Sequence, residues 1–435
     1  MRILLITDEV WNDKIHGNNV LTNWFEGFTA EFAQIYCSPG LPDNPCCDKY
    51  YQFTDKMMVD SIIKGKLAGK CVKERAKSIK IYNSTDMTRI GFLRKYCGNT
   101  LRLLKNIVWT LGKYNEETLK EFVTNFSPDL IFTPRMATPK LLRLERSVCK
   151  YANCPMLAFT GDNEYSLKMF SLSPIAWINK FWLRKELRKN ANLYSMYYTL
   201  SEEQQEEYQK VFKCPIKILR KCANDLNVIK SSDRHEINHP IRFVYAGKLY
   251  CNRWKTLAAI GKALSKINKE ECKAVLDIYT KDSLTKKQKN ALNYPGSIQL
   301  HGAISPSEVL EKYRNSDIAL HIESFDLKYK LATRVSFSTK IIDCLGGGCA
   351  LMVVAWKNHS GLTYLKKEDA AICVDDLGEI YNVIYSLVGN EDILERYKEK
   401  AIKCLEKNHN RRNVQKELFE EWSRLLDNNR GEFRK

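Results

Sequence analysis

The feature that most constrains the fold of this chain is a repeated alternation of short apolar runs with helical patterns. In the first half, strand-like runs occupy residues 3–7, 34–37, 130–133 and 156–160, and a helical pattern at 23–32 separates the first two. Such alternation is typical of βαβ units, in which helices connect parallel strands and cover the sheet. We therefore predict an α/β fold built on parallel sheets.

The same alternation begins again in the second half, after a polar stretch at residues 231–239 that contains almost no apolar side chain. Pro240 follows this stretch and breaks any element before it. We therefore place a domain boundary near residue 235. The chain has 435 residues, of which 44% are hydrophobic, and is long enough for two domains. The expected strands of the second series are residues 241–246, 275–280, 298–301, 318–322 and 350–354.

The last segment of the chain, residues 391–435, has apolar residues at helical spacing from Leu394 onward. We expect a pair of closing helices there. The predicted organisation is two similarly built α/β halves that face one another, residues 1–235 and 236–390, followed by these helices.

The composition limits the expected location and cofactors. The first ten residues carry one Arg ahead of a four-residue apolar run, so we expect no signal peptide, and no apolar run is long enough to span a bilayer. The 15 cysteines are scattered and form no C-x-x-C pair, which favours reduced, buried thiols. The 7 histidines never fall at metal-ligand spacing on one helix. We expect a cytoplasmic protein with no bound metal or other cofactor.

The turns that follow the strands are the places to look for a ligand site. In open α/β sheets, ligands bind beyond the carboxyl ends of the strands, where backbone amides at a helix start hold phosphate oxygens. The first such turn is long and polar and contains Gly17, Asn18 and Asn19 before the expected helix. We predict a glycine loop with exposed amides there, with an ordinary polar turn as the alternative.

The first turn of the second half combines a glycine with two cations. Gly247 and Lys248 directly follow the strand at 241–246, and Arg253 stands at the start of the next helix. Two cations beside a glycine turn suit a diphosphate, because charged donors form the stronger hydrogen bonds to phosphate oxygens. The alternative is a solvated helix start with ordinary surface cations.

The densest group of polar residues comes later in the second half. Ser338 and Thr339 precede a short expected helix, whose first amides and Lys340 could meet phosphate while Asp343 reaches a ribose hydroxyl. Three glycines end this helix before the strand at 350–354. A simple N-cap at Ser338 and a helix stop at the glycines are the alternative interpretation.

Four segments of the second half form a recognisable set: Ala246-Gly247-Lys248-Leu249 with Arg253, Leu300-His301-Gly302, Ser316-Asp317-Ile318 and the run from Phe337 to three glycines. Through them, residues 240–390 resemble the C-terminal domain of family 4 glycosyltransferases, in particular bacterial enzymes of surface polysaccharide biosynthesis such as capsule or lipopolysaccharide. The resemblance implies the GT-B fold, in which two Rossmann-like domains face a central cleft and C-terminal helices cross back. It also implies hexosyl transfer from a nucleotide-diphosphate sugar, with retention and without a metal.

The resemblance also assigns roles to single residues. Lys248 and Arg253 occupy the places of two basic residues that contact the donor diphosphate, and Asp343 that of an acid that binds the ribose. The family usually has two glutamates with seven residues between them, but this chain has Val335 at the first place and Asp343 at the second, so Glu323 is the candidate substitute.

The resemblance covers the first half only in outline. Asp162 follows the strand at 156–160, where the family often has a His-Asp pair near the acceptor. We take Asp162 as the catalytic candidate on the acceptor side and Glu323 as the catalytic candidate on the donor side. A turn-forming aspartate is the alternative interpretation of Asp162.

Two basic stretches predict contact with an anionic membrane surface. Residues 61–113 carry 13 Lys or Arg and only two acids, and the net charge of the chain is +18. In residues 173–189, aromatic side chains precede cations, an order that suits a headgroup interface. The second stretch equally fits core packing followed by a solvated end. Its aromatic residues are Trp177, Phe181 and Trp182, and its cations include Arg184, Lys185, Arg188 and Lys189.

We thus expect the N-terminal half to bind a glycan acceptor, one linked to lipid at the inner face of the membrane, and the C-terminal half to bind the nucleotide-diphosphate sugar. One alternative is a nucleotide-sugar epimerase of the same fold. Another is a basic nucleic-acid-binding protein, although the sequence lacks recognition motifs for specific nucleic acids.

Overall fold

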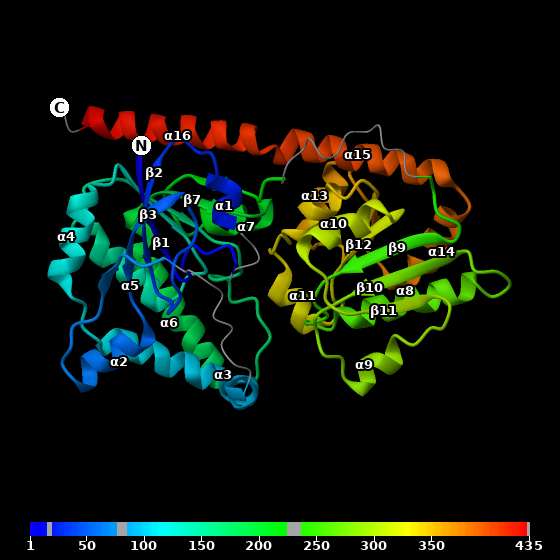
Figure 1. Ribbon diagram of the computed structural model, residues 1–435, viewed down its shortest axis with the longest axis horizontal. Coiled ribbons are helices and arrows are strands. Elements are labelled where there is room, and N and C mark those ends of the chain that lie inside the picture. The colour runs from blue at the N-terminus through cyan, green and yellow to red at the C-terminus, as the bar shows by residue number, and fades with distance from the viewer. Residues whose placement is uncertain (15–19, 76–84, 224–235, 433–435) are drawn as a thin grey trace. The chain divides into compact units, whose positions relative to one another are not determined.

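The structure is a computed structural model that describes residues 1–14, 20–75, 85–223 and 236–432 (Figure 1), with the backbone alone for residues 85–96 and 429–432. It contains two compact units. One comprises Met1–Leu219 and Gln415–Lys435, and the other comprises Arg220–Val414. The boundary that we expect near residue 235 lies outside the described residues, and the chain passes from one unit to the other at Leu219.

The first unit is built on an eight-stranded sheet with the order β4-β3-β2-β1-β5-β6-β7-β8. All neighbouring strands are parallel except β4, which pairs antiparallel with β3 at the edge. The central strands are buried almost throughout, as expected for a parallel sheet covered on both faces. The strands are β1 (Arg2–Thr7), β2 (Glu31–Tyr36), β3 (Cys47–Gln52), β4 (Lys70–Val72), β5 (Leu130–Pro134), β6 (Met156–Phe159), β7 (Tyr194–Thr199) and β8 (Ile216–Ile218).

Helices connect these strands, and polar N-caps begin several of them. The side chains of Thr54, Asn115 and Thr138 each accept a hydrogen bond from an amide of the first helical turn. The helices are α1 (Val20–Phe25), α2 (Asp55–Ile63), α3 (Thr85–Leu111), α4 (Glu116–Phe126), α5 (Pro139–Cys149), α6 (Pro174–Asn190) with the 3-10 turn η1 (Ala191–Leu193), and α7 (Glu202–Gln209).

The predicted helix at 23–32 is wrong in extent. α1 ends at Phe25, and Gly27 has a φ of +78°, a left-handed conformation that stops a helix. β2 then begins at Glu31, so the predicted strand at 34–37 starts three residues too late.

The C-terminal helix α16 (Arg411–Glu432) returns to the first unit, as predicted for closing helices that cross back. Trp422 is fully buried there, and its indole Nε1 donates to the hydroxyl of Tyr198 at 2.9 Å. Its ring also packs against Phe132, with 5.3 Å between ring centroids. The end of the chain therefore completes the core of the unit in which the chain began.

The second unit is built on a six-stranded, wholly parallel sheet with the order β11-β10-β9-β12-β13-β14. The five strands predicted for this half are all present. They are β9 (Ile241–Ala246), β10 (Ala274–Tyr279), β11 (Ile298–His301), β12 (Ile318–Ile322) and β13 (Ala350–Val354), and β14 (Ile372–Val374) is added at the edge.

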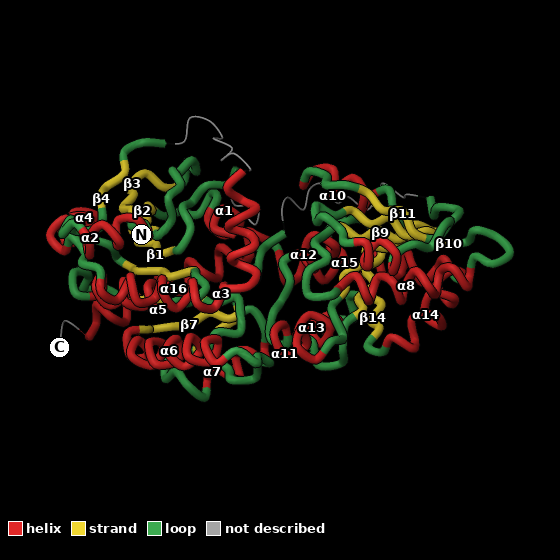
Figure 2. Tube along the Cα trace, turned by 90° about the horizontal axis from the view of Figure 1, so that it is seen from below, coloured by secondary structure: helices red, strands yellow, loops and turns green. Residues whose placement is uncertain are grey.

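Helices lie on both sides of this second sheet. Figure 2 shows α8 and α14 on one side and α12 and α13 on the other. The helices are α8 (Arg253–Ile267), α9 (Lys286–Ala291), α10 (Pro306–Arg314), α11 (Leu327–Thr333), α12 (Lys340–Leu345), α13 (Ser360–Lys367), α14 (Ile380–Val388), preceded by the 3-10 turn η3 (Leu377–Glu379), and α15 (Glu391–His409).

The strand order reverses once in each sheet. The reversal lies between β1 and β5 in the first unit and between β9 and β12 in the second. Ligands of open α/β sheets bind outside the carboxyl ends of the strands at such a reversal. The residues that follow these four strands are therefore the first to examine.

Candidate functional site

In the second unit, the ammonium group of Lys340 lies over the glycine turn that follows β9. A Cβ atom on Gly247 would lie 1.9 Å from Nζ of Lys340, so any larger residue there would require this side chain to move. Nζ donates a hydrogen bond to the carbonyl oxygen of Ala246 at 3.2 Å, and the amide of Gly247 donates to Tyr279 at 2.9 Å. The predicted glycine and lysine thus meet at the strand end.

Arg253 and Glu323 form a buried ion pair across the reversal. Arg253 is the first residue of α8, and Glu323 directly follows β12. Nε and Nη2 of Arg253 donate to the two carboxylate oxygens of Glu323 at 3.1 and 2.5 Å. The hydroxyl of Thr256 donates to the carbonyl of Glu323 at 2.7 Å. The guanidinium is therefore held in one orientation by a carboxylate that has both oxygens engaged.

The two buried cations of this site differ in their electrostatics. Burial alone lowers the pKa of Arg253, but the carboxylate of Glu323 outweighs it and raises that pKa above its ordinary value. Burial, helped by the positive charge of Arg253, lowers the pKa of Lys340. No carboxylate of the described residues forms an ion pair with Lys340 at the turn. An anion bound there would supply the missing negative charge.

The turn between Gly247 and α8 has an unusual backbone. Cys251 and Asn252 have φ values of 57° and 59°, in the left-handed region that residues other than glycine seldom adopt. The side chain of Asn252 donates to Asp326 at 2.7 Å, and Tyr250 places its ring 4.7 Å from the guanidinium carbon of Arg253. These contacts fix the start of α8. Lys248, in the same turn, is exposed, and its side chain forms no ion pair in the described part of the chain.

Ser338 and Thr339, the hydroxyl residues predicted before α12, do not cap this helix with their side chains. Thr339 stands at the N-cap position with a helical backbone and makes no side-chain cap bond, so Ser338 is not the N-cap. The carbonyl of Ser338 instead accepts from the amide of Ile341 at 3.0 Å. Asp343 pairs with Lys221, with 2.7 Å between Oδ1 and Nζ, and its carboxylate is about a third exposed. A ribose hydroxyl that reaches Asp343 would share it with this lysine.

His321 is a buried residue of this site that the sequence analysis did not identify. Its Nε2 atom lies 3.7 Å from Oε1 of Glu323 and has no hydrogen-bond partner among the described residues. Burial lowers the pKa of His321 well below its ordinary value, which keeps the ring neutral. The sequence could have indicated His321 as a neighbour of Glu323. Residues two apart on a strand share a face, and Glu323 lies two residues after His321.

In the first unit, Asp162 lies in the turn that follows β6. Its carbonyl accepts from the side-chain amide of Gln204 at 2.8 Å and from the backbone of Glu164 at 2.9 Å. Glu164, which the sequence analysis missed, is 5% exposed and accepts from the amide of Ala137. Burial raises its pKa to about 7, and Oε2 lies 3.9 Å from Nη1 of the buried Arg135. The buried acid Glu164 thus lies two residues after the predicted acid Asp162.

At the strand reversal of the first unit, Asp8 and Lys140 form a second ion pair. Asp8 follows β1, and Lys140 lies in the first turn of α5 after β5. The ammonium is 3% exposed and lies 5.2 Å from the ring of Trp109, while the carboxylate is 44% exposed. The amide of Cys37 donates to the carbonyl of Asp8 at 3.1 Å. Each sheet therefore carries a cation–carboxylate pair at its reversal.

The predicted glycine loop with Gly17, Asn18 and Asn19 lies outside the described residues. Among the residues that the structure does describe, no three His, Cys, Asp or Glu side chains gather as metal ligands. No helix in the described ranges is long and apolar enough to cross a membrane.

Comparisons with known proteins establish the fold. No family model matches the sequence, and no curated protein sequence matches it. A sucrose-phosphate synthase from Thermosynechococcus elongatus has a similar structure with a TM-score of 0.60 at 12% identity, covering 98% of this chain and 99% of that one. Anabaena HepE in complex with UDP gives 0.60 at 13% identity, with coverage of 97% and 100%.

A third similar structure is described as trehalose-6-phosphate from Escherichia coli, bound with UDP-2-fluoro glucose. It gives a TM-score of 0.59 at 9% identity and covers 97% of this chain and 99% of that one. At such identities the likeness defines architecture rather than activity. The chain has the α/β GT-B fold of two parallel-sheet domains that the sequence predicted.

Proposed function

We propose that this protein is a glycosyltransferase that binds a nucleotide-diphosphate sugar in its second unit and transfers the sugar to a glycan. The observation that carries the proposal is the Lys340 ammonium over Gly247, a desolvated cation without a carboxylate partner at the strand reversal. A diphosphate fits this place by charge, because it would supply the negative charge that the buried ammonium of Lys340 lacks.

UDP is the nucleotide that we propose for the donor. The solved structures of HepE and of the Escherichia coli protein were obtained with UDP and UDP-2-fluoro glucose, and both share the fold of this chain. We keep Asp343 as the group that binds the ribose, together with Lys221, its partner.

The proposed chemistry rests on charge stabilisation. When the sugar leaves, negative charge grows on the diphosphate, and Lys340 and Lys248 would stabilise it as preorganised cations. Arg253 adds charge from a fixed position. Both oxygens of Glu323 are engaged with Arg253, so we propose that Glu323 positions the guanidinium instead of contacting the sugar. The transfer would retain configuration and need no metal.

The first unit would bind the acceptor at the carboxyl edge of its sheet. Asp162 and Asp8, which are partly exposed, supply carboxylates there, and carboxylates accept hydrogen bonds from sugar hydroxyls. We propose a lipid-linked glycan of surface polysaccharide biosynthesis as the acceptor, met at the cytoplasmic face of the membrane.

The test is release of nucleoside diphosphate from UDP-, GDP- and ADP-glucose in the presence of EDTA, with and without a glycan extract. We expect UDP-glucose alone to be cleaved, faster with the extract, and the product to carry the sugar in its original configuration. Cleavage that frees an epimerised sugar would instead identify an epimerase. No cleavage of any donor, together with salt-sensitive RNA binding, would identify a nucleic-acid-binding protein.

A further inference from the structure

Large exposed apolar side chains gather in one region of the first unit. More than half of those in the described surface lie between Val59 and Phe181. Ile63 on α2 is 74% exposed, Leu111 on α3 is 63% exposed and Leu172, just before α6, is 89% exposed. Scattered single residues of this kind are ordinary, but a contiguous group marks an interaction surface.

The described part of α3 exposes leucines on its outer side and buries a polar residue beside an apolar one. Its buried side carries Asn106 and Trp109, whose side chains bond to Asn179 at 3.3 Å and to Asp55 at 2.7 Å. Leu101 and Leu104 lie on the opposite side and are 41% and 53% exposed. A surface helix in water normally directs its apolar stripe inward and its polar residues outward. The outer side of α3 therefore fits an apolar partner.

The helices α2, α3 and α6 form one continuous surface. The bonds from Trp109 to Asp55 and from Asn106 to Asn179 join α3 to α2 and α6, and the amide of Lys113 donates to Ser61 at 3.1 Å. Figure 1 shows α2 and α3 side by side along the lower edge of this unit. We call their exposed side chains the apolar face: Ile62, Ile63, Leu101, Leu104, Leu111, Ile178 and Phe181.

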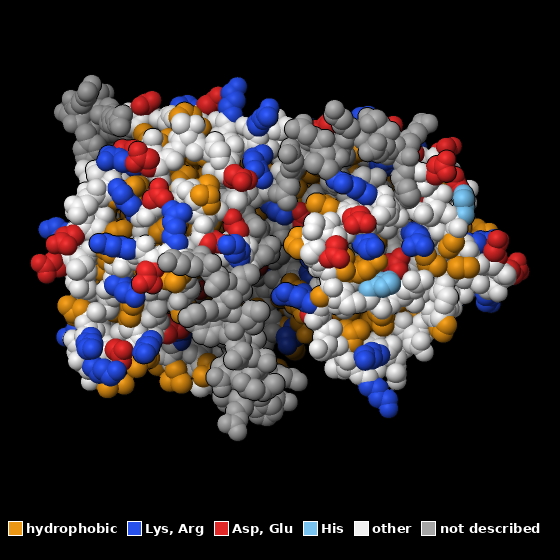
Figure 3. Space-filling view, viewed as in Figure 1, with side chains coloured by type: hydrophobic (Ala, Val, Ile, Leu, Met, Phe, Trp, Pro, Cys, Tyr) orange, Lys and Arg blue, Asp and Glu red, His pale blue; other side chains and the backbone are white. Residues whose placement is uncertain are grey.

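Cations outnumber acids around the apolar face, although Asp55 and Asp60 of α2 pair with Lys105 and Lys64. Residues 97–113 carry three Lys or Arg and no acid, and residues 174–190 carry five and a single Glu. Where Figure 3 shows the edge formed by α2, Lys and Arg side chains alternate with hydrophobic ones. Apolar side chains bordered by cations match the chemistry of a bilayer with acidic lipids.

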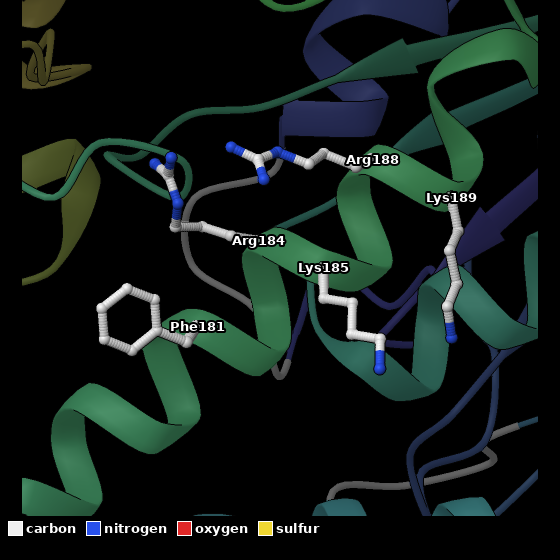
Figure 4. A pocket seen from close by; sticks show the side chains of 5 residues that line it. All are labelled: Phe181, Arg184, Lys185, Arg188 and Lys189. Carbon is white, nitrogen blue, oxygen red and sulfur yellow. The ribbon is translucent and has the colours of Figure 1, made fainter.

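A groove on α6 is lined by Phe181 and four cations and has a volume of about 390 Å³. Figure 4 shows Arg184 and Arg188 directed to one side of the helix and Lys185 and Lys189 to the other, and Lys189 pairs with Glu186 at 2.6 Å. Arg188 donates to the hydroxyl of Tyr165 at 2.8 Å, and the guanidinium carbon of Arg184 lies 4.0 Å from the same ring. These contacts hold two planar donors in place before any ligand arrives. The other two cations are Lys185 and Lys189.

We propose that the apolar face and this groove dock the protein on an anionic phospholipid bilayer. Ile63, Leu104 and Phe181 enter the boundary between headgroups and acyl chains, and the cations of the groove bind lipid phosphates. The proposal rests on this surface alone and holds whether or not the second unit binds a nucleotide. It explains how a chain without a described spanning helix would meet a lipid-linked acceptor.

A second copy of this chain fits the surface less well. Two-fold contact between copies would place the same patch on each side, so the five cations of residues 174–190 would face their own equivalents. Such like charges repel at an interface, whereas lipid phosphates neutralise them. Charge complementarity therefore favours the bilayer.

The test is sedimentation of the full chain with vesicles of phosphatidylcholine, alone or mixed equally with phosphatidylglycerol. We expect binding to the mixed vesicles only, weakened by salt. The triple variant Ile63→Ser, Leu104→Ser, Phe181→Ser should bind at least about tenfold more weakly. Tyr381→Ser with Tyr385→Ser, which changes exposed rings of the second unit, is the matched control and should bind like the wild type.

Two results would overturn the proposal. One is equal sedimentation of the triple variant and the wild type with mixed vesicles. The other is no vesicle binding by the wild type, with a self-association in solution that the triple variant lacks, which would assign the face to a second copy. UDP binding and melting temperature are measured on each variant, so a loss of fold or of donor binding is distinguished from a loss of docking.

Discussion

The ammonium of Lys340 occupies the space that a side chain at Gly247 would need, 94 residues away from the carbonyl it bonds at Ala246. This contact joins the start of α12 to the end of β9. A change at Gly247 therefore affects the position of Lys340.

Replacing Gly247 by Ala should displace Lys340 and abolish nucleotide binding. The added Cβ would lie 1.9 Å from Nζ, but Nζ is the end of a flexible side chain, so the lysine moves and the turn survives. We expect little change in melting temperature and at least a tenfold loss of UDP affinity, about 1.4 kcal/mol. Calorimetry with UDP checks this. Unchanged affinity in a folded variant would remove Lys340 from the site.

Replacing Lys340 by Met should raise the melting temperature while removing UDP binding. Burial lowers the pKa of this lysine, so the folded state disfavours its charge, and a neutral side chain of similar length removes that cost. Differential scanning fluorimetry checks the stability. Lys262→Met, on the exposed side of α8, is the control and should change neither property.

The affinity for UDP should fall at alkaline pH. The lowered pKa of Lys340 means that the free protein loses this proton at a lower pH than an ordinary lysine does. A bound diphosphate favours the charged form, so binding weakens as the pH rises through that pKa. We expect Lys340→Arg to keep its affinity over the same range, because a guanidinium stays charged. Parallel pH profiles of the two proteins would contradict this.

Replacing Glu323 by Gln should destabilise the second unit. The change leaves Arg253 buried beside a neutral amide, and an uncompensated buried charge costs about 3–5 kcal/mol. Asp375→Asn breaks the exposed pair with Lys366 and should cost at most about 1 kcal/mol. Urea unfolding of both variants measures the difference. A loss in Glu323→Gln no larger than in the control would show that the buried pair does not need its carboxylate.

The stability of the first unit should depend on Glu164. Its pKa is about 7 when folded and near 4.5 when unfolded, so the folded state holds the proton more tightly. The resulting stabilisation is complete below about pH 4.5 and is lost as the pH rises through about 7, by about 3 kcal/mol in all. Glu164→Gln should lose this pH dependence. Melting curves at pH 5 and pH 8 compare the two proteins.

The second unit could be predicted from the sequence more fully than the first. Its strands are short apolar runs bounded by turn residues, and a parallel sheet buries such runs on both faces, so periodicity was sufficient. In the first unit, Gly27 ends α1 early through its left-handed backbone, and β4 joins the sheet antiparallel with mostly exposed residues. Neither feature has an apolar pattern that would reveal it.

The residues of the donor site could be named from the sequence, but their partners could not. Gly247, Arg253, Glu323 and Lys340 were all candidates, and the structure brings them to one strand reversal. Glu323 uses both carboxylate oxygens on Arg253, which lies 70 residues earlier in the chain. Asp343 likewise has a partner, Lys221, that precedes it by 122 residues. Motif spacing along the chain carries no information on such long-range pairs.

The most direct test of the account is calorimetric titration of UDP into the wild type, Lys340→Met and Lys262→Met. We expect saturable binding of one UDP by the wild type and by Lys262→Met, and none by a folded Lys340→Met. Equal binding by all three proteins, or binding by none, would contradict a donor site at Gly247 and Lys340.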